Sequence, residues 1–342
     1  MVKAKPVAAV VGSNSLLGRE LRDVLSRSQF QIKLIGADEV EAGTLTEEGG
    51  EPLVITALDQ DNLAAARVVF LAGSPESSGK ALEIVSKLRP RPVVVDLTYA
   101  LEDRPTAHLR APVVEPAGTL LPPGSEHVVA HPAAILLALF LVRLGQAGTI
   151  RRAIAHVFEP ASERGQRGID ELHRQTANVL TFQKLPKAVY DEQAAFNLLA
   201  RYGAEAPLSM ENIETRVERH LATLLAMNAG VQMPSIRLIQ APVFHGHSVS
   251  LWVEFEVNPG VPALEQTLAS VYIDVRGADV EAPNVVGMAG QSGIAVGAIA
   301  TDRNDARATW FWVAADNLRI AAENAVEVAL PLAGPPEAGA HQ

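Results

Sequence analysis

The sequence predicts an α/β protein with an N-terminal, doubly wound, Rossmann-like parallel sheet and a second domain of the α+β type. In the N-terminal part, short apolar and β-branched segments alternate with segments of helical length, which is typical of a parallel sheet covered on both faces. A glycine turn joins the first of these strands to the first helix. Later in the chain, strands and helices no longer alternate, and 342 residues exceed what one hydrophobic core usually serves.

The composition predicts a soluble, globular protein. Hydrophobic residues make up 48% of the chain and charged residues 20%. A net charge of −10 and the lack of any basic block argue against nucleic acid or an anionic membrane as a partner. The chain contains no Cys, which excludes thiol catalysis and favours a cytoplasmic location. We expect no signal peptide, and the longest apolar run, residues 133–142, is too short to span a bilayer.

The first predicted elements are a strand at residues 6–11, a tight turn at residues 12–18 and a helix that ends near Ser26. Further apolar, β-branched strands are predicted at residues 32–35, 67–73 and 92–96. Prolines then indicate an extended connection over residues 111–124.

The turn at residues 12–18, with the sequence GSNSLLG, is a candidate nucleotide-binding turn. The full dinucleotide fingerprint is Gly-x-Gly-x-x-Gly, whereas here Gly12 and Gly18 bracket Ser15. Contact with a cofactor phosphate and a bare strand-to-helix turn therefore both remain open. The candidate cofactor-binding residues in and near this turn are Gly12, Ser13, Asn14, Ser15, Leu16, Leu17, Gly18 and, at the end of a later strand, Gly73.

Acidic residues follow the second predicted strand and favour NAD over NADP. Asp38 lies about 20 residues beyond the turn, where a carboxylate can accept hydrogen bonds from an adenosine ribose. Glu39 and Glu41 would repel a 2′-phosphate. A solvated strand end with no cofactor at all is the alternative interpretation.

The second half of the chain begins with a strand, a turn and a strongly apolar helix over residues 128–142. This stretch contains no Cys, Ser, Thr or Lys, so its turn offers none of these nucleophiles. Asp316 is a preferred N-cap residue for a final helix. The other predicted elements are a strand at 154–158, helices at 165–180 and 213–227, a half-exposed antiparallel strand or pair at 235–257, and a strand at 310–313.

Five motifs carry a resemblance to a known family. They are the N-terminal glycine turn, GIDELHRQ at 168–175, AAFNLL at 194–199, APVFHGH at 241–247 and WVAADNLRIAAENAV at 312–326. With these motifs the sequence resembles the aspartate-semialdehyde dehydrogenase family of amino-acid biosynthesis, and more closely its catalytically divergent Usg-type relatives.

The resemblance implies a domain organisation. Residues 1–131 and 316–334 would form the NAD(P)-binding, Rossmann-like domain, and residues 132–315 a catalytic-type domain that also makes a homodimer. Residues 335–342 would be a disordered tail. The half-apolar strand with Trp252, Val253 and Phe255 suits such a self-complementary interface.

The resemblance also implies a set of site residues. In the family, a Cys attacks the aldehyde carbon, NADP takes the hydride and phosphate attacks the thioester, while a His serves as acid and base. The nucleophile position falls on Ala134 and the acid/base His on His247. The family Gln falls on Glu159 and the carboxylate-binding Arg on Gln240. In the final helix, Asn317 is a further cofactor-binding candidate.

These departures predict a pseudoenzyme. Without a thiolate no thiohemiacetal forms, and Gln240 withdraws the charge that would hold a carboxylate substrate. We therefore expect a non-catalytic or regulatory homodimer without aspartate-semialdehyde dehydrogenase activity. Two alternatives are an NAD-dependent oxidoreductase that uses His247 without a covalent step, and a binding protein for a small metabolite.

Two histidines on one strand, His245 and His247, suggest a metal only weakly, because no third ligand is evident beside them. We expect no metal site. His131, beside a proline and an apolar helix, is interpreted first as a structural histidine. Glu159 is interpreted as a partner that holds His247 protonated, or else as a carboxylate at the edge of an open cleft.

Overall fold

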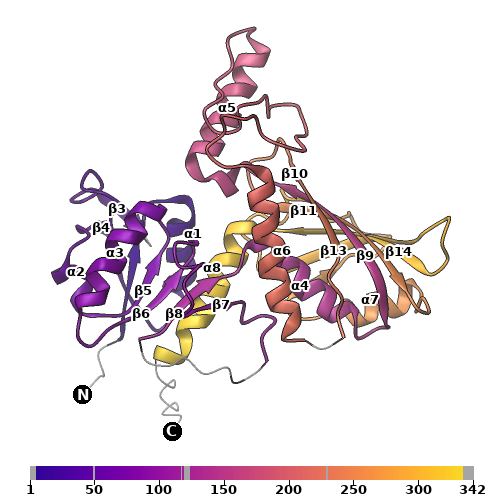
Figure 1. Cartoon of the computed structure of the whole chain (residues 1–342), viewed down its shortest axis with the longest axis horizontal. Helices are drawn as coiled ribbons and strands as arrows, with labels where there is room; N and C mark the ends of the chain where they lie inside the picture. The colour runs from indigo at the N-terminus through magenta and orange to yellow at the C-terminus, as the bar shows by residue number, and fades with distance from the viewer. Residues whose placement is uncertain (1–4, 49–50, 117, 119–123, 229, 334–342) are drawn as a thin grey trace. The chain divides into compact units, whose positions relative to one another are not determined.

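The computed structural model describes residues 5–48, 51–116, 118, 124–228 and 230–333. The predicted tail at 335–342 lies outside the described residues. The chain forms two compact units (Figure 1), one made of residues 1–130 and 321–342 and the other of residues 131–320. Within the part of the chain that the structure describes, no helix combines the length and the apolar character that crossing a membrane requires.

The first unit contains a six-stranded sheet in which all strands run parallel. Its order is β2-β1-β5-β6-β8-β7. The chain runs from β1 outward to β2 and then returns to the other side of β1 with β5, which confirms the predicted doubly wound topology. The strands are β1 (Val7–Val11), β2 (Gln31–Ile35), β5 (Ala66–Leu71), β6 (Val93–Asp96), β7 (Ala107–Arg110) and β8 (Glu126–Val129).

The helices of the first unit are amphipathic, and their apolar residues pack against the buried strands. Leu21 and Leu25 of α1 are fully buried, as are Ala81 and Val85 of α3. The bounds are α1 (Leu16–Ser26), α2 (Gln60–Ala64) and α3 (Pro75–Lys87), with a small hairpin of β3 (Leu45–Glu48) and β4 (Glu51–Val54). This hairpin was not predicted.

The second unit is built on a mixed sheet, as expected for an α+β domain. Its order is β10-β9-β11-β14-β13-β12. Its strands are β9 (Ile150–Glu159), β10 (Ser235–Gln240), β11 (His247–Phe255), β12 (Ile273–Val275), β13 (Ile294–Thr301) and β14 (Ala308–Ala315). For residues 235–257 the sequence predicted a half-exposed antiparallel strand or a pair of them. The pair is wrong, because β10 and β11 do not pair with each other, whereas β11 is an antiparallel strand. Instead β10 runs parallel to β9 on one side, and β11 runs antiparallel to β9 on the other.

Helices contribute to the core on one face of this sheet. Phe140 of α4 meets Phe311 of β14 edge to face, with 5.2 Å between the ring centroids. Val253 and Phe255 of β11 are fully buried in the core of this unit, so the prediction that they contribute to a dimer interface together with Trp252 is wrong. The helices of this unit are α4 (Pro132–Leu144), α5 (Gly165–Leu180), α6 (Met210–Ala226) and α7 (Val261–Leu268), with the short 3-10 turn η1 (Ala161–Arg164). The last helix, α8 (Asn317–Ala329), begins in this unit, but its residues from 321 on belong to the first unit, as does the 3-10 turn η2 (Leu330–Ala333).

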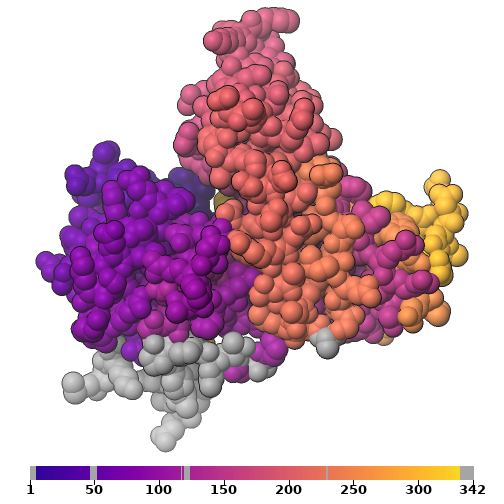
Figure 2. All heavy atoms as spheres, in the orientation of Figure 1, coloured from indigo at the N-terminus to yellow at the C-terminus, as the bar shows by residue number. Residues whose placement is uncertain are grey.

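The opposite side chains of the same strands are accessible. Ile154 of β9 is 41% exposed and Trp310 of β14 is 39% exposed, whereas Trp252 and Trp312 are half-buried. We call these four residues the open sheet face. In a separate part of this unit, α5 and the segment after it form a projection (Figure 2).

Candidate functional site

A buried group of imidazole and carboxylate side chains lies in the second unit. We call it the His–Glu cluster, and its four members are His131, Glu159, Glu163 and His247. His131 precedes α4, Glu159 ends β9, Glu163 lies in η1 and His247 begins β11. The side chains are at most 9% exposed. Three parts of the sequence, at residue 131, residues 159–163 and residue 247, therefore bring ionisable groups together in the interior.

The turn η1 forms because β9 ends at Glu159 and Pro160 cannot continue the hydrogen-bond ladder. The amides of Ala161 and Ser162 donate to the carbonyls of Val243 and Phe244, each at 2.9 Å. These bonds hold η1 against the segment that leads into β11. As a result, the carboxylate of Glu163 lies beside both histidines of the cluster.

Arg164 forms a buried ion pair with Glu159. Its Nη2 donates to Oε1 of Glu159, and the two side chains are 7% and 0% exposed. The interpretation that Glu159 holds His247 protonated is therefore wrong. Burial lowers the pKa of His247 to about 4, although the charge of Glu159 acts in the opposite direction. His247 is neutral at physiological pH.

Asn317 connects the cluster to the first turn of α8. Its Nδ2 donates to Oε1 of Glu163 at 2.7 Å, and its Oδ1 accepts from the amide of Gly246 at 2.9 Å. The hydroxyl of Ser162 donates to the same Oδ1 at 3.1 Å. The side chain of Asn317, which the sequence suggested for cofactor binding, is thus hydrogen-bonded within the second unit.

The predicted N-cap of the final helix is confirmed, because Oδ1 of Asp316 accepts from the amides of Leu318 and Arg319.

His131 caps α4, and Ala134 lies in the first turn of that helix. Nδ1 of His131 accepts from the amide of Ala133 at 3.2 Å, and Nε2 lies 3.4 Å from Oε2 of Glu163. Burial lowers the pKa of His131 well below its usual value, with nearby imidazoles and guanidinium groups acting in the same direction. Ala134 is fully buried and offers only a methyl group.

Burial raises the pKa of both carboxyl groups of the cluster above the usual range for Glu. Two atoms of the cluster, Oε2 of Glu159 and Nε2 of His247, have no hydrogen-bond partner among the described residues. Nε2 of His247 lies 3.9 Å from Oε1 of Glu163, beyond hydrogen-bond distance. Buried polar atoms are nearly always paired, so these two atoms indicate a place for a ligand.

Gln240, at the end of β10, is fully hydrogen-bonded. Its Nε2 donates to the carbonyls of Glu159 and Ala241 at 2.9 and 3.0 Å, and its Oε1 accepts from the hydroxyl of Tyr202 at 2.6 Å. The side chain is 1% exposed. Gln240 therefore supports the backbone at Glu159 and has no group left for a substrate carboxylate.

In the first unit, the predicted nucleotide turn lies at the carboxyl ends of β1 and β5. Gly12 has a φ of +75°, and a Cβ built on it would lie 2.2 Å from Cα of Gly73. A Cβ on Gly18 would lie 2.1 Å from the carbonyl oxygen of Gly12. The hydroxyl of Ser15 caps α1 by accepting from the amide of Gly18 at 2.8 Å. Close packing at this turn thus depends on three glycines.

The chain order changes direction between β1 and β5, and ligands of doubly wound sheets bind at such a point. The hydroxyl of Ser13 is buried there without a partner among the described residues. The first amides of a helix have no partners within the helix, and of those in α1 the amide of Gly18 donates to the hydroxyl of Ser15. Asn14, Leu16 and Leu17 are at least partly accessible in the same turn. These features fit a phosphate group.

Asp38 stabilises the loop after β2 with one oxygen. Its Oδ1 accepts from the amides of Val40 and Glu41 at 3.0 and 3.1 Å. Oε2 of Glu41 accepts from the amide of Ala37 at 2.7 Å. The exposed Asp38 carboxylate thus keeps its second oxygen for solvent or a ribose.

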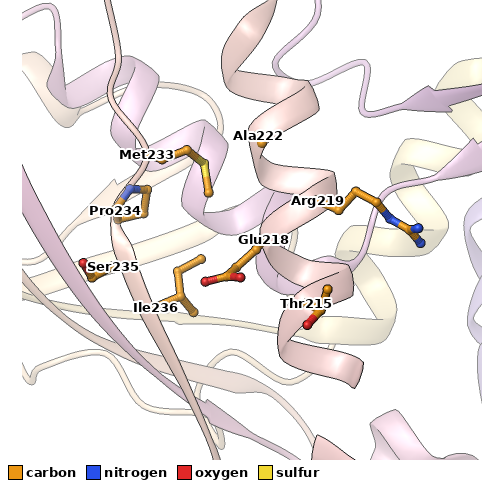
Figure 3. A pocket seen from close by; sticks show the side chains of 8 residues that line it. All are labelled: Thr215, Glu218, Arg219, Ala222, Met233, Pro234, Ser235 and Ile236. Carbon is orange, nitrogen blue, oxygen red and sulfur yellow. The ribbon is translucent and has the colours of Figure 1, made fainter. Parts of the chain in front are cut away.

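A shallow hollow lies on the surface of the second unit, away from the predicted site residues. It measures about 590 Å³ and lies between α6 and the start of β10. Figure 3 shows Glu218 and Met233 pointing into it from opposite sides, while Arg219 points away. No predicted site residue lines it.

The sequence interpretation missed Glu163 and Arg164. Both lie in the motif EPASERG, and a charged pair directly before Gly165 was the available signal. The φ of +64° at Gly165 lets the chain turn there from η1 into α5. The contacts of the pair with β9, α4 and α8 depend on tertiary structure, and no local pattern reports them.

Comparison with known proteins relates both units to one family. The family model described as semialdehyde dehydrogenase, dimerisation domain, matches residues 141–320. A protein named USG-1 protein homolog from Pseudomonas aeruginosa is 30% identical over 329 residues, which cover 93% of this chain and 95% of that protein. An aspartate-semialdehyde dehydrogenase from Rickettsia bellii is 26% identical over 94% of this chain and 96% of its own length.

The fold agrees with these sequence matches. A solved structure of a probable aspartate-semialdehyde dehydrogenase from Pseudomonas aeruginosa has a TM-score of 0.83 and 26% identity, and the match covers 96% of this chain and 99% of that chain. The family match spans more than half of the chain, and the relatives align over nearly all of it. The chain belongs to the semialdehyde dehydrogenase family.

Proposed function

We propose that this chain is a non-catalytic, homodimeric member of the semialdehyde dehydrogenase family that has no acyl-transferring activity. The observation that carries the proposal is the complete absence of Cys from the 342 residues. A thiolate both attacks the aldehyde carbon and leaves again when the thioester is cleaved. The position that we assign to this nucleophile is Ala134, and a methyl group does neither.

The hydroxyl of Ser162 in η1 does not replace the thiol. It donates to Oδ1 of Asn317 rather than to an imidazole. No base is thus placed to take its proton. Gln240 uses its amide groups within the protein, which argues against a role in holding substrate. Without a nucleophile there is no covalent step in which His247 could act as acid or base.

We propose that any nucleotide bound by the chain is NAD rather than NADP, with its pyrophosphate at the Gly12–Gly18 turn. The N-terminus of α1 and the unpaired hydroxyl of Ser13 support phosphate binding. The second oxygen of Asp38 would accept from the adenosine ribose, and the acidic side chains beside it would repel a 2′-phosphate. A bound dinucleotide would supply a hydride acceptor, and this chain would hold it without using it.

The activity test uses the purified full chain with aspartate semialdehyde, inorganic phosphate, and either NAD or NADP. We expect no nucleotide reduction above the rate without protein, while an active Cys-containing relative reduces its nucleotide in the same assay. Turnover that is abolished by His247→Asn would contradict the non-catalytic role. Calorimetric titration with each nucleotide then separates binding from catalysis. We choose calorimetry because all three Trp residues lie in the second unit, so their fluorescence is a poor measure of nucleotide binding in the first unit.

We propose that the homodimer forms through the open sheet face, whose accessible aromatic side chains suit a self-complementary interface. Ile154→Glu would place an unpaired charge in that interface, and we expect the dimer dissociation constant to rise at least about tenfold. Val271→Glu is the matched control, because Val271 is 92% exposed and lies outside the open sheet face. Sedimentation equilibrium measures both variants. A monomeric wild-type protein, or equal effects of both substitutions, would refute this interface.

A further inference from the structure

We propose that the His–Glu cluster binds one divalent transition-metal ion through His131, Glu159, Glu163 and His247. The site lies wholly within the second unit. This inference goes beyond the proposed function and does not depend on it, because an ion can hold the fold together whether or not the protein catalyses a reaction. It also reverses our expectation from the sequence that no metal is bound.

The distances in the cluster suit a shared ion. One ligand atom from each of His131, Glu159 and Glu163 lies within 4.8 Å of the other two. Nε2 of His131 is 3.4 Å from Glu163 Oε2, and Nε2 of His247 is 3.9 Å from Glu163 Oε1. Ligand atoms at about 2.0–2.2 Å from a tetrahedral ion lie roughly 3.4 Å from one another. Three of the groups thus already lie close enough to share an ion. His247 is not part of this set of three, and a movement of its ring toward Glu163 would add it as the fourth ligand.

The unpaired atoms of the cluster provide the second, independent observation. Oε2 of Glu159 and Nε2 of His247 lack hydrogen-bond partners among the described residues, and both side chains are at most 1% exposed. Each of these buried atoms requires a partner. An ion bound by both Oε2 of Glu159 and Nε2 of His247 would supply it.

Neighbouring side chains orient the two carboxylates. Arg164 binds Oε1 of Glu159 and leaves Oε2 free, while Nδ2 of Asn317 binds Oε1 of Glu163 and leaves Oε2 facing His131. Metal-binding carboxylates commonly have such hydrogen bonds from residues that do not touch the ion. With neutral imidazoles, the two carboxylates and Arg164 sum to a charge of −1, so a divalent cation is not repelled.

Metal binding would change the proton position on His131. The amide of Ala133 donates to Nδ1 at 3.2 Å, so the proton of the neutral ring is on Nε2. An ion on Nε2 displaces that proton to Nδ1 and breaks the long bond from Ala133. One weak capping bond is then lost in exchange for a metal–nitrogen bond. The change of tautomer is a specific signature of ligation by His131.

The donor set indicates the class of metal and its role. Imidazole with carboxylate suits Zn²⁺, Co²⁺, Fe²⁺ or Mn²⁺ rather than the all-oxygen sites of Ca²⁺. The ligands come from three separate parts of the sequence, at residue 131, residues 159–163 and residue 247, and each is almost completely buried. We therefore assign the ion a structural role. It would stabilise the contacts between the start of α4, the end of β9, η1 and the start of β11. His245 is half-exposed and does not belong to the set.

The first experiment measures metal content in the untagged full chain. The protein is stripped with a chelator, dialysed against buffer with Zn²⁺, and analysed by elemental mass spectrometry and thermal unfolding. We expect about one Zn²⁺ per chain and a higher melting temperature that a chelator reverses. Glu163→Gln should weaken Zn²⁺ binding at least about tenfold. His156→Asn, which replaces a half-exposed histidine of β9 outside the cluster, should leave Zn²⁺ binding unchanged. No retained Zn²⁺ in the wild type, or equal binding by Glu163→Gln, would overturn the site.

The second experiment needs no variant and therefore does not depend on whether Glu163→Gln folds. Long-range ¹H–¹⁵N spectra of the histidine rings identify which ring nitrogen carries the proton. Zn²⁺ should move the proton of His131 from Nε2 to Nδ1 and shift Nε2 of His247. If Zn²⁺ perturbs only rings outside the cluster, such as the half-exposed His156, and leaves both cluster histidines unchanged, the ion is bound elsewhere and the assignment is wrong.

Discussion

Replacing Arg164 with Met is expected to lower the free energy of unfolding of the second unit by about 3–5 kcal/mol. Arg164 is the cation of a buried pair, and its removal leaves the carboxylate of Glu159 without its neutralising partner in a fully buried position. A single charge left unpaired in the interior costs far more than the intact pair contributes. Methionine fills a similar volume, so loss of packing adds little to the effect.

Urea unfolding followed by Trp fluorescence measures this change, because all Trp residues are in the second unit. A chelator is present throughout, so that metal binding does not contribute. The double variant Arg164→Met with Glu159→Gln should recover most of the loss, since the uncompensated charge is gone. Arg167→Met is the control, because Arg167 is an exposed residue of the same region. Equal stabilities of Arg164→Met and Arg167→Met would contradict the assigned pair.

The sequence predicted the regular elements of this protein better than the contacts between them. The helix expected at 165–180 is α5 with the same bounds, because a long amphipathic period is a local property. The β3 and β4 strands were missed because LTEE and EPLV carry charges and a proline instead of an alternating pattern. The pairing at 235–257 was wrong because β9, which is distant in the sequence, inserts between the two strands.

In the candidate site, too, single residues were predicted better than the contacts between them. Ala134, Glu159, Gln240 and His247 were singled out one by one, but the sequence offered no means of pairing them. Glu159 was matched with His247, whereas tertiary structure gives it Arg164. Burial also decides the charge of His247, because loss of solvation outweighs the nearby carboxylate. Solvation of one side chain depends on every element around it, so it is visible only in the folded structure.

Replacing Gly12 with Ala is expected to destabilise the first unit by about 2–4 kcal/mol and to abolish any nucleotide binding there. The φ of +75° is unfavourable for any residue with a Cβ, and the new atom would lie 2.2 Å from Cα of Gly73. Because Gly73 contributes backbone rather than a flexible side chain, the ends of β1 and β5 must separate to relieve the clash. The two strands that define the ligand position would then no longer meet.

Gly79→Ala is the matched control in the same unit. Gly79 lies inside α3, and a Cβ there meets no atom within 4 Å, so this substitution should stabilise the protein by about 0.5–1 kcal/mol. Far-UV circular dichroism measures the unfolding of both variants in urea. Titration calorimetry measures whether NAD still binds at the turn. The opposite signs separate the effect of position from the effect of the added methyl group. If Gly12→Ala unfolds at the same urea concentration as the wild type, the tight approach of β1 to β5 does not limit the stability of this unit.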